Sequence, residues 1–137
     1  MFQDLGRALY SVHQYDEAIL NLKKSLTLGP EDPEAYHYLG RAQAAKGDWK
    51  DAIISYQKAI ALGHNEAAEN LADALYADRQ YNEAVRNYQE AIQTEPDSPE
   101  AHYGLARALR KLNREKEALQ ELSKATKLDP KLTPPTD

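Results

Sequence analysis

Apolar residues recur at helical spacing between Pro33 and His64, and a glycine divides them into two runs. One run precedes Gly47 and the other follows it, and within each run the apolar positions lie three or four residues apart. The residues on the two apolar faces are Tyr36, Leu39, Gly40, Ala42, Ala52, Ile53, Tyr56, Ala59 and Ile60. This pattern predicts two amphipathic helices joined by a tight turn.

Local signals agree with these helix boundaries. Asp32 is a good N-cap residue, and Pro33 then stands at the first helical position, where its missing N–H costs nothing. Gly47 supplies the left-handed backbone geometry that ends the first helix.

The two-helix pattern occurs four times along the chain. Ala18, Ala52, Ala84 and Ala118 begin the same small-apolar run at spacings of 34, 32 and 34 residues, and Leu5, Leu39, Leu71 and Leu105 repeat at the same intervals. Pro30, Pro96 and Pro130 close three units, and His64 stands at the remaining closing position. The units span about 1–32, 33–64, 65–98 and 99–132. Helices are predicted over residues 2–13, 16–28, 33–46, 49–62, 65–78, 81–94, 99–112 and 115–128.

These residues resemble the tetratricopeptide repeat (TPR): a leucine, a following Gly or Ala, an Ala-x-x-x-aromatic/Leu-x-x-Ala run and a closing Pro. The resemblance covers roughly Phe2 to Pro130, and four matches in register favour it over a generic helical bundle. It implies an all-α fold, a right-handed α-solenoid of four helix-turn-helix repeats over residues 1–130. It also implies a protein–protein interaction module within a larger scaffold or adaptor.

Two departures from the regular pattern fall around the third unit. The junction at Gly63 and His64 is two residues short and resembles that of the Sel-like relatives of the family, so the stacking of units two and three is expected to differ. Arg79 replaces the turn glycine, and an arginine tolerates positive φ poorly. We expect this turn to be either strained or built differently.

The two ends of the array differ in character. The first unit opens directly on an interior-type helix, so we expect a piece of a longer array, with an apolar face at Phe2, Leu5 and Leu9 that seeks a partner and could form a homo-oligomer. The fourth unit carries Glu115 and Thr126 at positions that are apolar in the other units, as a natural C-terminal end would. The segment 131–137 is rich in Pro, Thr and Asp and is expected to be disordered.

Composition excludes several classes of function. The chain has 137 residues, no cysteine and 17 Lys and Arg against 22 Asp and Glu, a net charge of −5. That sign argues against nucleic-acid binding, and the absence of cysteine excludes disulfides and thiolate metal sites. No apolar run is long enough for a membrane span, and no targeting segment is visible. Cytoplasmic localisation is the default expectation.

No catalytic or metal-binding pattern is present. The four histidines occupy different positions in different units, and none has a second metal ligand at helical spacing. There is no phosphate-binding loop and no nucleophile elbow. Trp49 holds the position of Tyr15 and Tyr81 and is expected to be a core aromatic residue that bridges helices. We predict neither enzyme activity nor a cofactor.

The family register places the first helix of each unit on the concave side of the array, where it would line a binding groove. The candidate ligand-binding residues on this face are Arg7, Tyr10, His37, Tyr38, Arg41, Glu69, Asn70, Asp73, Tyr76, Tyr103, Arg107 and Arg110. Arg7, Arg41 and Arg107 share one position in three units, and Asp73 holds it in the other. The family's carboxylate-clamp pattern is incomplete in either register, which argues against a chaperone adaptor.

Two interpretations of the arginine row remain open. Each arginine could pair with a carboxylate of its own or a neighbouring helix, such as Asp4 for Arg7 and Glu66 or Glu69 for Arg41. Alternatively, the row could accept acidic groups of an extended peptide or protein partner. A self-assembling structural array, whose main partner is a second copy, is the alternative function.

Overall fold

The computed structural model describes the backbone of residues 2–132 and the side chains from Asp4 onward. This part of the chain contains eight α-helices and one short 3₁₀ helix. Their bounds are α1 Phe2–Ser11, α2 Tyr15–Leu28, α3 Pro33–Ala45, α4 Trp49–Ala61, η1 Asn65–Ala67, α5 Ala68–Ala77, α6 Tyr81–Thr94, α7 Pro99–Lys111 and α8 Glu115–Leu128. The predicted helices are confirmed to within two residues, except that α5 starts later because its predicted first turn is the 3₁₀ helix.

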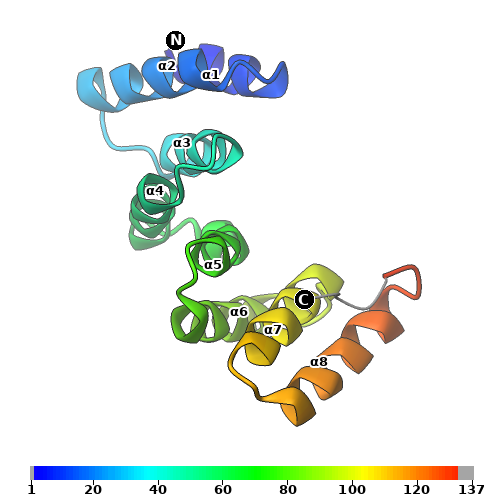
Figure 1. The fold of residues 1–137 in the computed structure, drawn as a ribbon. Coiled ribbons are helices and arrows are strands. Elements are labelled where there is room, and N and C mark those ends of the chain that lie inside the picture. Colours follow the sequence, from blue (N-terminus) through cyan, green and yellow to red (C-terminus); the bar gives the residue numbers. More distant parts are fainter. Residues whose placement is uncertain (1, 133–137) are drawn as a thin grey trace.

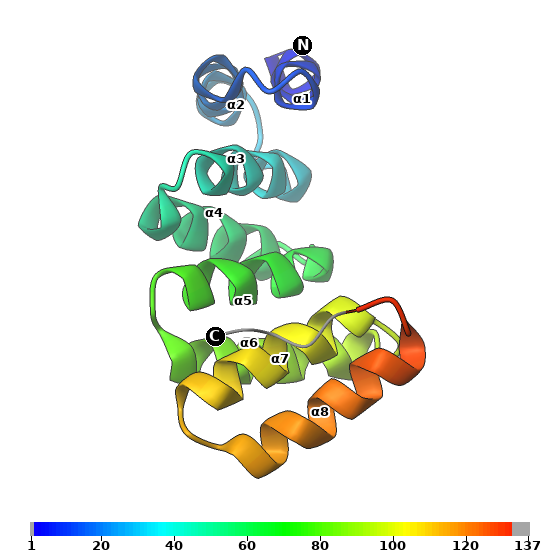
Figure 2. The same ribbon diagram turned by 45° about the vertical axis from the view of Figure 1, so that its right-hand side comes forward.

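The helices form consecutive antiparallel pairs that stack into a curved array. α1 packs on α2, α3 on α4, α5 on α6 and α7 on α8, and the second helix of each pair contacts the first helix of the next. Figures 1 and 2 show this stack from two sides, with the N-terminal pair at one end and α8 at the other. The fold is therefore an α-solenoid, as predicted.

The predicted caps are present. The Asp32 carboxylate accepts a hydrogen bond from the Glu34 N–H at 2.9 Å, and the Ser98 hydroxyl oxygen accepts one from the Ala101 N–H at 3.2 Å. Each cap precedes a proline that starts its helix. These bonds satisfy N–H groups that a helix start would otherwise leave unpaired.

The turn between the two helices of each pair has one repeated geometry. After α3, Gly47 has φ 83°, its N–H bonds Ala44 O, and the next N–H bonds Gln43 O, both at 2.9 Å. This double hydrogen bond is the Schellman arrangement. Arg79 adopts the same geometry with φ 64°, so its turn is not built differently, and the arginine is held in a region that favours glycine.

Small residues let the helices approach closely. Ala18 and Ala52 are fully buried, and Gly40 lies so close to the Tyr56 ring that a Cβ there would come within 2.6 Å of Cε1. The main core runs through the second, third and fourth pairs, and a smaller cluster around Leu22 joins the first pair to α3. This continuous packing fixes the spacing of the odd-numbered helices.

Both ends of the stack expose apolar side chains that the interior units bury. Leu5 is 47% exposed, whereas its equivalent Leu39 is 5% exposed. Leu119 on α8 is 52% exposed, whereas its equivalent Ile53 is 7% exposed. The predicted contribution of Phe2 to the first face lies outside the described side chains. Of the segment 131–137, predicted to be disordered, Lys131 and Leu132 lie in a turn and their N–H groups bond Asp129, and residues 133–137 lie outside the described residues.

Candidate functional site

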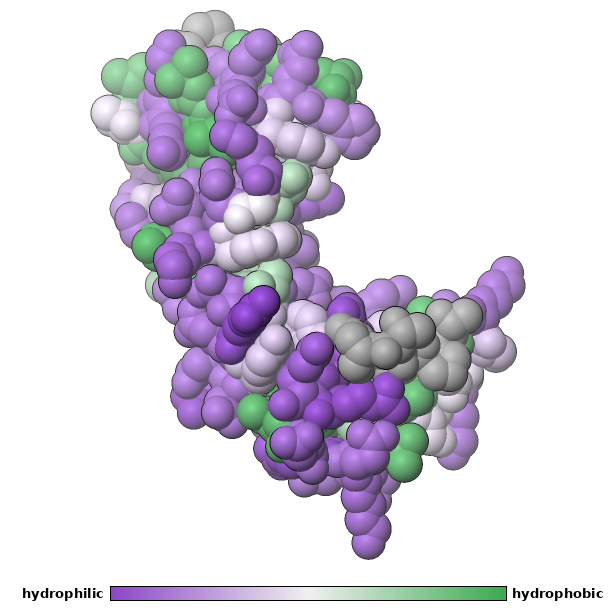
Figure 3. Space-filling view, in the orientation of Figure 1, coloured by the Kyte–Doolittle hydropathy of each residue, from purple (hydrophilic) through white to green (hydrophobic). Residues whose placement is uncertain are grey.

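The predicted concave surface contains a cavity between the second and third helix pairs. The molecule is hollowed on the side of α3 and α5, and this side is largely hydrophilic (Figure 3). A cavity of about 330 Å³ is lined by Tyr10, Arg41, Ala44, Ala45, Trp49, Tyr56, Asn70, Asp73 and Ala74. Four of the predicted ligand-binding residues therefore meet in one place: Tyr10, Arg41, Asn70 and Asp73.

Arg41 occupies the wall of this cavity and is held there by aromatic rings. Its guanidinium carbon lies 4.8 Å from the centre of the Tyr10 ring and 5.5 Å from that of Tyr38. Both distances are within the range of cation–π attraction. Arg41 forms no ion pair with any carboxylate in the described part of the chain, so the predicted pairing with Glu66 or Glu69 is wrong. The two rings therefore hold the guanidinium in place, and no carboxylate of the described residues pairs with its charge.

The other arginines of the row are engaged differently. Arg7 pairs with Glu34 at 3.3 Å rather than with Asp4, and its guanidinium lies 5.0 Å from the Tyr38 ring centre. A hydrogen bond to Tyr38 and the charge of Glu34 raise the pKa of Arg7. The Arg107 guanidinium lies 4.6 Å from the centre of the Tyr76 ring. In this row Arg7 pairs with Glu34, and the guanidinium groups of Arg41 and Arg107 each lie against an aromatic ring.

Arg110 is tied to the end of its own unit. It forms a two-pronged ion pair with Glu115, with Nη2 to Oε1 at 3.0 Å and Nε to Oε2 at 3.3 Å. This pairing uses Nε and Nη2 of Arg110, one of the predicted ligand-binding residues. Tyr103, on the same helix, is half-buried.

The third unit makes the middle of the surface acidic. The Tyr88 hydroxyl donates a short hydrogen bond to Asp73, and the Ser98 hydroxyl donates one to Glu69 at 3.2 Å. Although Asp73 keeps solvent-exposed surface, the protein atoms around its carboxyl raise its pKa, and the Tyr88 bond and the Arg107 charge oppose this rise. Burial and the nearby Asp73 likewise raise the pKa of Glu69.

A chain of hydrogen bonds links the second unit to the third beside the cavity. His37 Nε2 lies 2.9 Å from Asn70 Oδ1, and His37 Nδ1 lies 2.9 Å from His64 Nε2. One consistent assignment has His37 donating to Asn70 and His64 donating to His37, with both rings neutral. Burial is the main cause that lowers the pKa of His37, and His64 and Arg41 add to it. Two predicted ligand-binding residues, His37 and Asn70, thus also connect units across the short junction.

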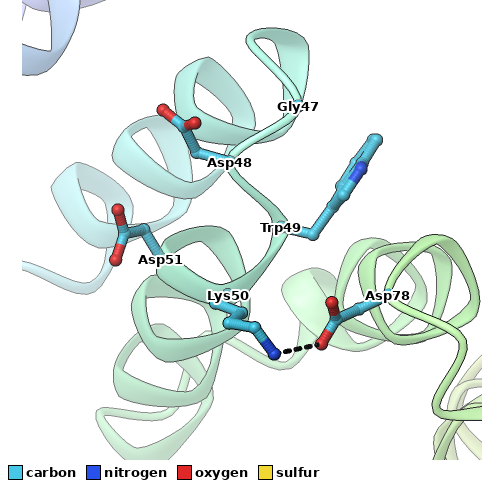
Figure 4. A pocket seen from close by; sticks show the side chains of 6 residues that line it. All are labelled: Gly47, Asp48, Trp49, Lys50, Asp51 and Asp78. Atoms are coloured by element: carbon cyan, nitrogen blue, oxygen red, sulfur yellow. Dashed lines mark hydrogen bonds and ion pairs between the residues drawn. The ribbon is translucent and has the colours of Figure 1, made fainter.

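Trp49 packs against the core, in agreement with the sequence prediction, but its side chain is only half-buried. The exposed part of the indole lines two cavities. One is the cavity beside Arg41 described above, and the other is shown in Figure 4. In this other cavity the indole stands clear of α4, and the Lys50–Asp78 ion pair of 3.4 Å lies on the opposite side. The loss of bulk next to Trp49, at Ala44, is the feature that the sequence analysis missed. Comparison with Tyr10 and Tyr76 at the same position could have found it.

The described residues contain neither a metal-binding cluster nor a membrane-spanning helix. Between residues 2 and 132 there is no group of three His, Cys, Asp or Glu side chains arranged to hold a metal ion. No helix in this range is long and apolar enough to cross a membrane.

The fold and its repeated turns define an all-helical repeat protein, and comparison with known families identifies which one. Tetratricopeptide-repeat family models match residues 4–67 and residues 75–134. Together they cover most of the chain. The chain belongs to the tetratricopeptide repeat family.

Relatives and solved structures agree with this assignment. Protein FlbA of Caulobacter vibrioides is 31% identical over 131 residues, which cover 92% of this chain and 22% of FlbA. The Hsp70-Hsp90 organizing protein of Triticum aestivum is 34% identical over 79 residues, covering 56% of this chain and 14% of that protein. The chain therefore spans about a fifth of FlbA and about a seventh of the Hsp70-Hsp90 organizing protein.

Two solved structures have nearly the same backbone. The crystal structure of MamA superposes with a TM-score of 0.89 at 26% identity, covering 95% of this chain and 77% of MamA. That of YrrB, described as a TPR protein with an unusual peptide-binding site, also has a TM-score of 0.89, at 23% identity, over 95% of this chain and 68% of YrrB. The similarity to YrrB concerns the fold alone.

Proposed function

We propose that this chain is a protein-interaction module whose concave surface binds an extended, acidic segment of a partner protein. Arg41 is the central anchor, and Arg7 and Arg107 are flanking donors. The observation that carries the proposal is the state of Arg41, a cation held by two rings beside a cavity without a carboxylate partner in the described residues. The proposal assigns the chain no catalytic role and no cofactor.

The contact between the Arg41 guanidinium and a carboxylate of the partner gains strength from the loss of water around it. A hydrogen bond between a guanidinium and a carboxylate is stronger where water is excluded, and a partner segment seated over the cavity would exclude water from the half-buried Arg41. Such a charged bond contributes about 1.5–3 kcal/mol, so its loss weakens binding about tenfold or more. Tyr10 and Tyr38 reduce the entropy lost on binding because they already restrict the arginine.

The charges of the third unit set the polarity of the ligand. Asp73 lines the cavity together with Arg41, and Glu69 lies one turn earlier on α5. Both carboxylates repel an acidic residue placed over them. The bound segment is therefore expected to place its acidic residue at Arg41 and a neutral or basic residue over α5.

The test is titration of an acidic peptide library against the wild-type chain and the Arg41→Glu variant. Arg86→Glu is the matched control, because it makes the same change of charge at an exposed position on α6 that pairs only locally with Glu83 at 3.4 Å. We expect binding to be lost in Arg41→Glu and kept in Arg86→Glu. Equal binding by all three proteins, or a preference for basic peptides, contradicts the proposal.

A second candidate function is self-assembly into a longer array. It is supported by Leu5 and Leu119, which are exposed at the two ends although their equivalents Leu39 and Ile53 are buried. α8 of one copy could pack on α1 of another as each second helix packs on the next first helix within the chain. The molar mass in solution is expected to rise with concentration, and Leu119→Glu to abolish the rise. A constant monomer mass up to millimolar concentration excludes this candidate.

A further inference from the structure

One position on the concave side is occupied differently in each helix pair. It is the fifth residue after the conserved leucine of the first helix, and it faces the first residue of the second helix. The four pairs of facing residues are Tyr10 with Tyr15, Ala44 with Trp49, Tyr76 with Tyr81, and Arg110 with Glu115. Only the second pair has a small residue opposite an aromatic ring.

In the first and third units a tyrosine fills this position and contacts the facing ring. The ring centres are 5.6 Å apart for Tyr10 and Tyr15 and 5.4 Å apart for Tyr76 and Tyr81, with tilted or edge-to-face geometry. These distances and angles are those that aromatic pairs prefer. In two of the four units, therefore, an aromatic ring packs against the first residue of the second helix.

In the second unit the corresponding space is part of the cavity. Ala44, Ala45 and Ala74 provide small apolar lining, and the Trp49 and Tyr56 rings provide aromatic walls. The volume of about 330 Å³ is large enough for one phenol or phenyl side chain together with neighbouring backbone of a ligand. The half-buried indole of Trp49 is available as a stacking surface.

We infer that the concave surface takes an aromatic side chain of the partner, tyrosine or phenylalanine, into the space beside Ala44, where it packs against Trp49. This inference deepens the proposed function and rests on it, since the cavity shares Arg41 with the proposed acidic contact. It adds a specificity pocket and names Ala44 as the residue that opens it. The partner segment then carries an aromatic residue next to, or one residue removed from, the acidic residue that binds Arg41.

A ring fits this cavity better than a cationic side chain does. Arg41 lines the cavity and repels a second cation, and Asp73 already accepts the hydrogen bond of Tyr88. A neutral ring meets neither obstacle, and a phenol hydroxyl can still bond to the polar residues at the rim. An arginine or lysine guest is thus the outcome that would count against the inference.

The first experiment uses a probe that lacks any acidic group, so it does not depend on the Arg41 contact. 4-Methylphenol, the tyrosine side chain, is titrated while the fluorescence of Trp49 is followed, since Trp49 is the only tryptophan of the chain. Methylguanidinium is titrated in parallel. We expect a saturable change with 4-methylphenol and none with methylguanidinium at equal concentration.

The Ala44→Tyr variant fills the space with the residue that the first and third units use there. Ala61→Tyr is the matched control: this exposed residue ends α4, about 18 Å along the helix from Trp49. We expect Ala44→Tyr to weaken 4-methylphenol binding at least about tenfold and Ala61→Tyr to leave it unchanged. Far-ultraviolet circular dichroism and thermal melting verify that both variants fold. Equal binding by Ala44→Tyr, absence of saturable binding by the wild-type chain, or tighter binding of methylguanidinium overturns the inference.

Peptides separate this inference from the proposed function. Nine-residue Gly/Ser peptides carry one Glu and, two positions away, Tyr or Ala. If only the aromatic pocket is wrong, the Tyr and Ala peptides bind equally and both lose affinity in Arg41→Glu. If only the acidic contact is wrong, the Tyr peptide stays preferred, Ala44→Tyr removes this preference, and Arg41→Glu changes nothing.

Discussion

Arg110 and Glu115 form a two-pronged ion pair at the position where the first and third units place two tyrosine rings against each other. The same position at the start of each second helix is therefore filled by two rings in the first and third units and by two charges in the fourth, whereas in the second unit it borders the cavity beside Ala44. A surface pair of this kind contributes little to stability, because water competes for both charges. The aromatic pairs also bury apolar area, so they are expected to contribute more.

The aromatic and ionic versions of this slot are predicted to differ in stability. Tyr81→Ala is expected to lower the free energy of unfolding by about 2 kcal/mol, through loss of the ring contact with Tyr76 and of buried area. Glu115→Ala is expected to lower it by less than about 1 kcal/mol. Urea denaturation of both variants measures the difference. A larger loss in Glu115→Ala would show that the ion pair is the stronger contact.

Replacing Arg79 by glycine is predicted to raise the free energy of unfolding. A residue other than glycine at positive φ costs about 1–2 kcal/mol, and glycine loses part of this gain to its greater freedom in the unfolded chain. Arg79→Gly is thus expected to stabilise the fold by about 0.5–1 kcal/mol. Asn113, with φ 61°, is the matched position, and Asn113→Gly is expected to gain almost nothing because asparagine tolerates this region. Equal gains would contradict the strain argument.

Gly40 is predicted to be required for close packing. In Gly40→Ala the added Cβ would meet the Tyr56 ring at 2.6 Å, so the helices must separate, at a cost of about 1–3 kcal/mol. Gly29→Ala is the control, since the backbone at Gly29 is extended and its Cβ would meet only Ser25 O at 3.4 Å. Thermal melting should show a clear loss for the first variant and a change within about 0.5 kcal/mol for the second.

The helices and their ends could be predicted because they depend on local spacing and on residues such as Asp32 and Gly47. The positions of the concave arginines also followed from the repeat. Their partners did not, because Arg7 on α1 pairs with Glu34 on α3, in the next unit, and the Arg41 guanidinium lies against rings from two helices. The His37–His64 contact joins residues 27 positions apart, and no spacing rule along one helix indicates it. The space at Ala44 is not indicated by the repeat pattern, because that pattern is defined by the side chains shared between units and not by a side chain that one unit lacks.

The half-buried imidazole of His37 predicts a pH dependence of stability. Because the folded state lowers the pKa of His37, the unfolded chain takes up the proton first as the pH falls. The contribution of His37 is fully present above about pH 6.5, the unfolded value, and is lost between that pH and the lower folded-state pKa. Urea denaturation from pH 8 to pH 5 should show a smaller loss in His37→Gln than in the wild-type chain. The raised pKa values of Glu69 and Asp73 act in the opposite direction and are present in both proteins. Identical pH profiles would contradict the prediction.

Arg41 is proposed to bind a carboxylate of the partner, and substitutions on both sides of this contact test the pairing. The dissociation constants of one peptide with Glu and its twin with Gln at the same position are measured against the wild-type chain and Arg41→Gln. The account predicts that the Glu peptide binds the wild-type chain about tenfold or more tightly than the Gln peptide, and that this ratio falls to near one in Arg41→Gln. The same ratio in both proteins would contradict it.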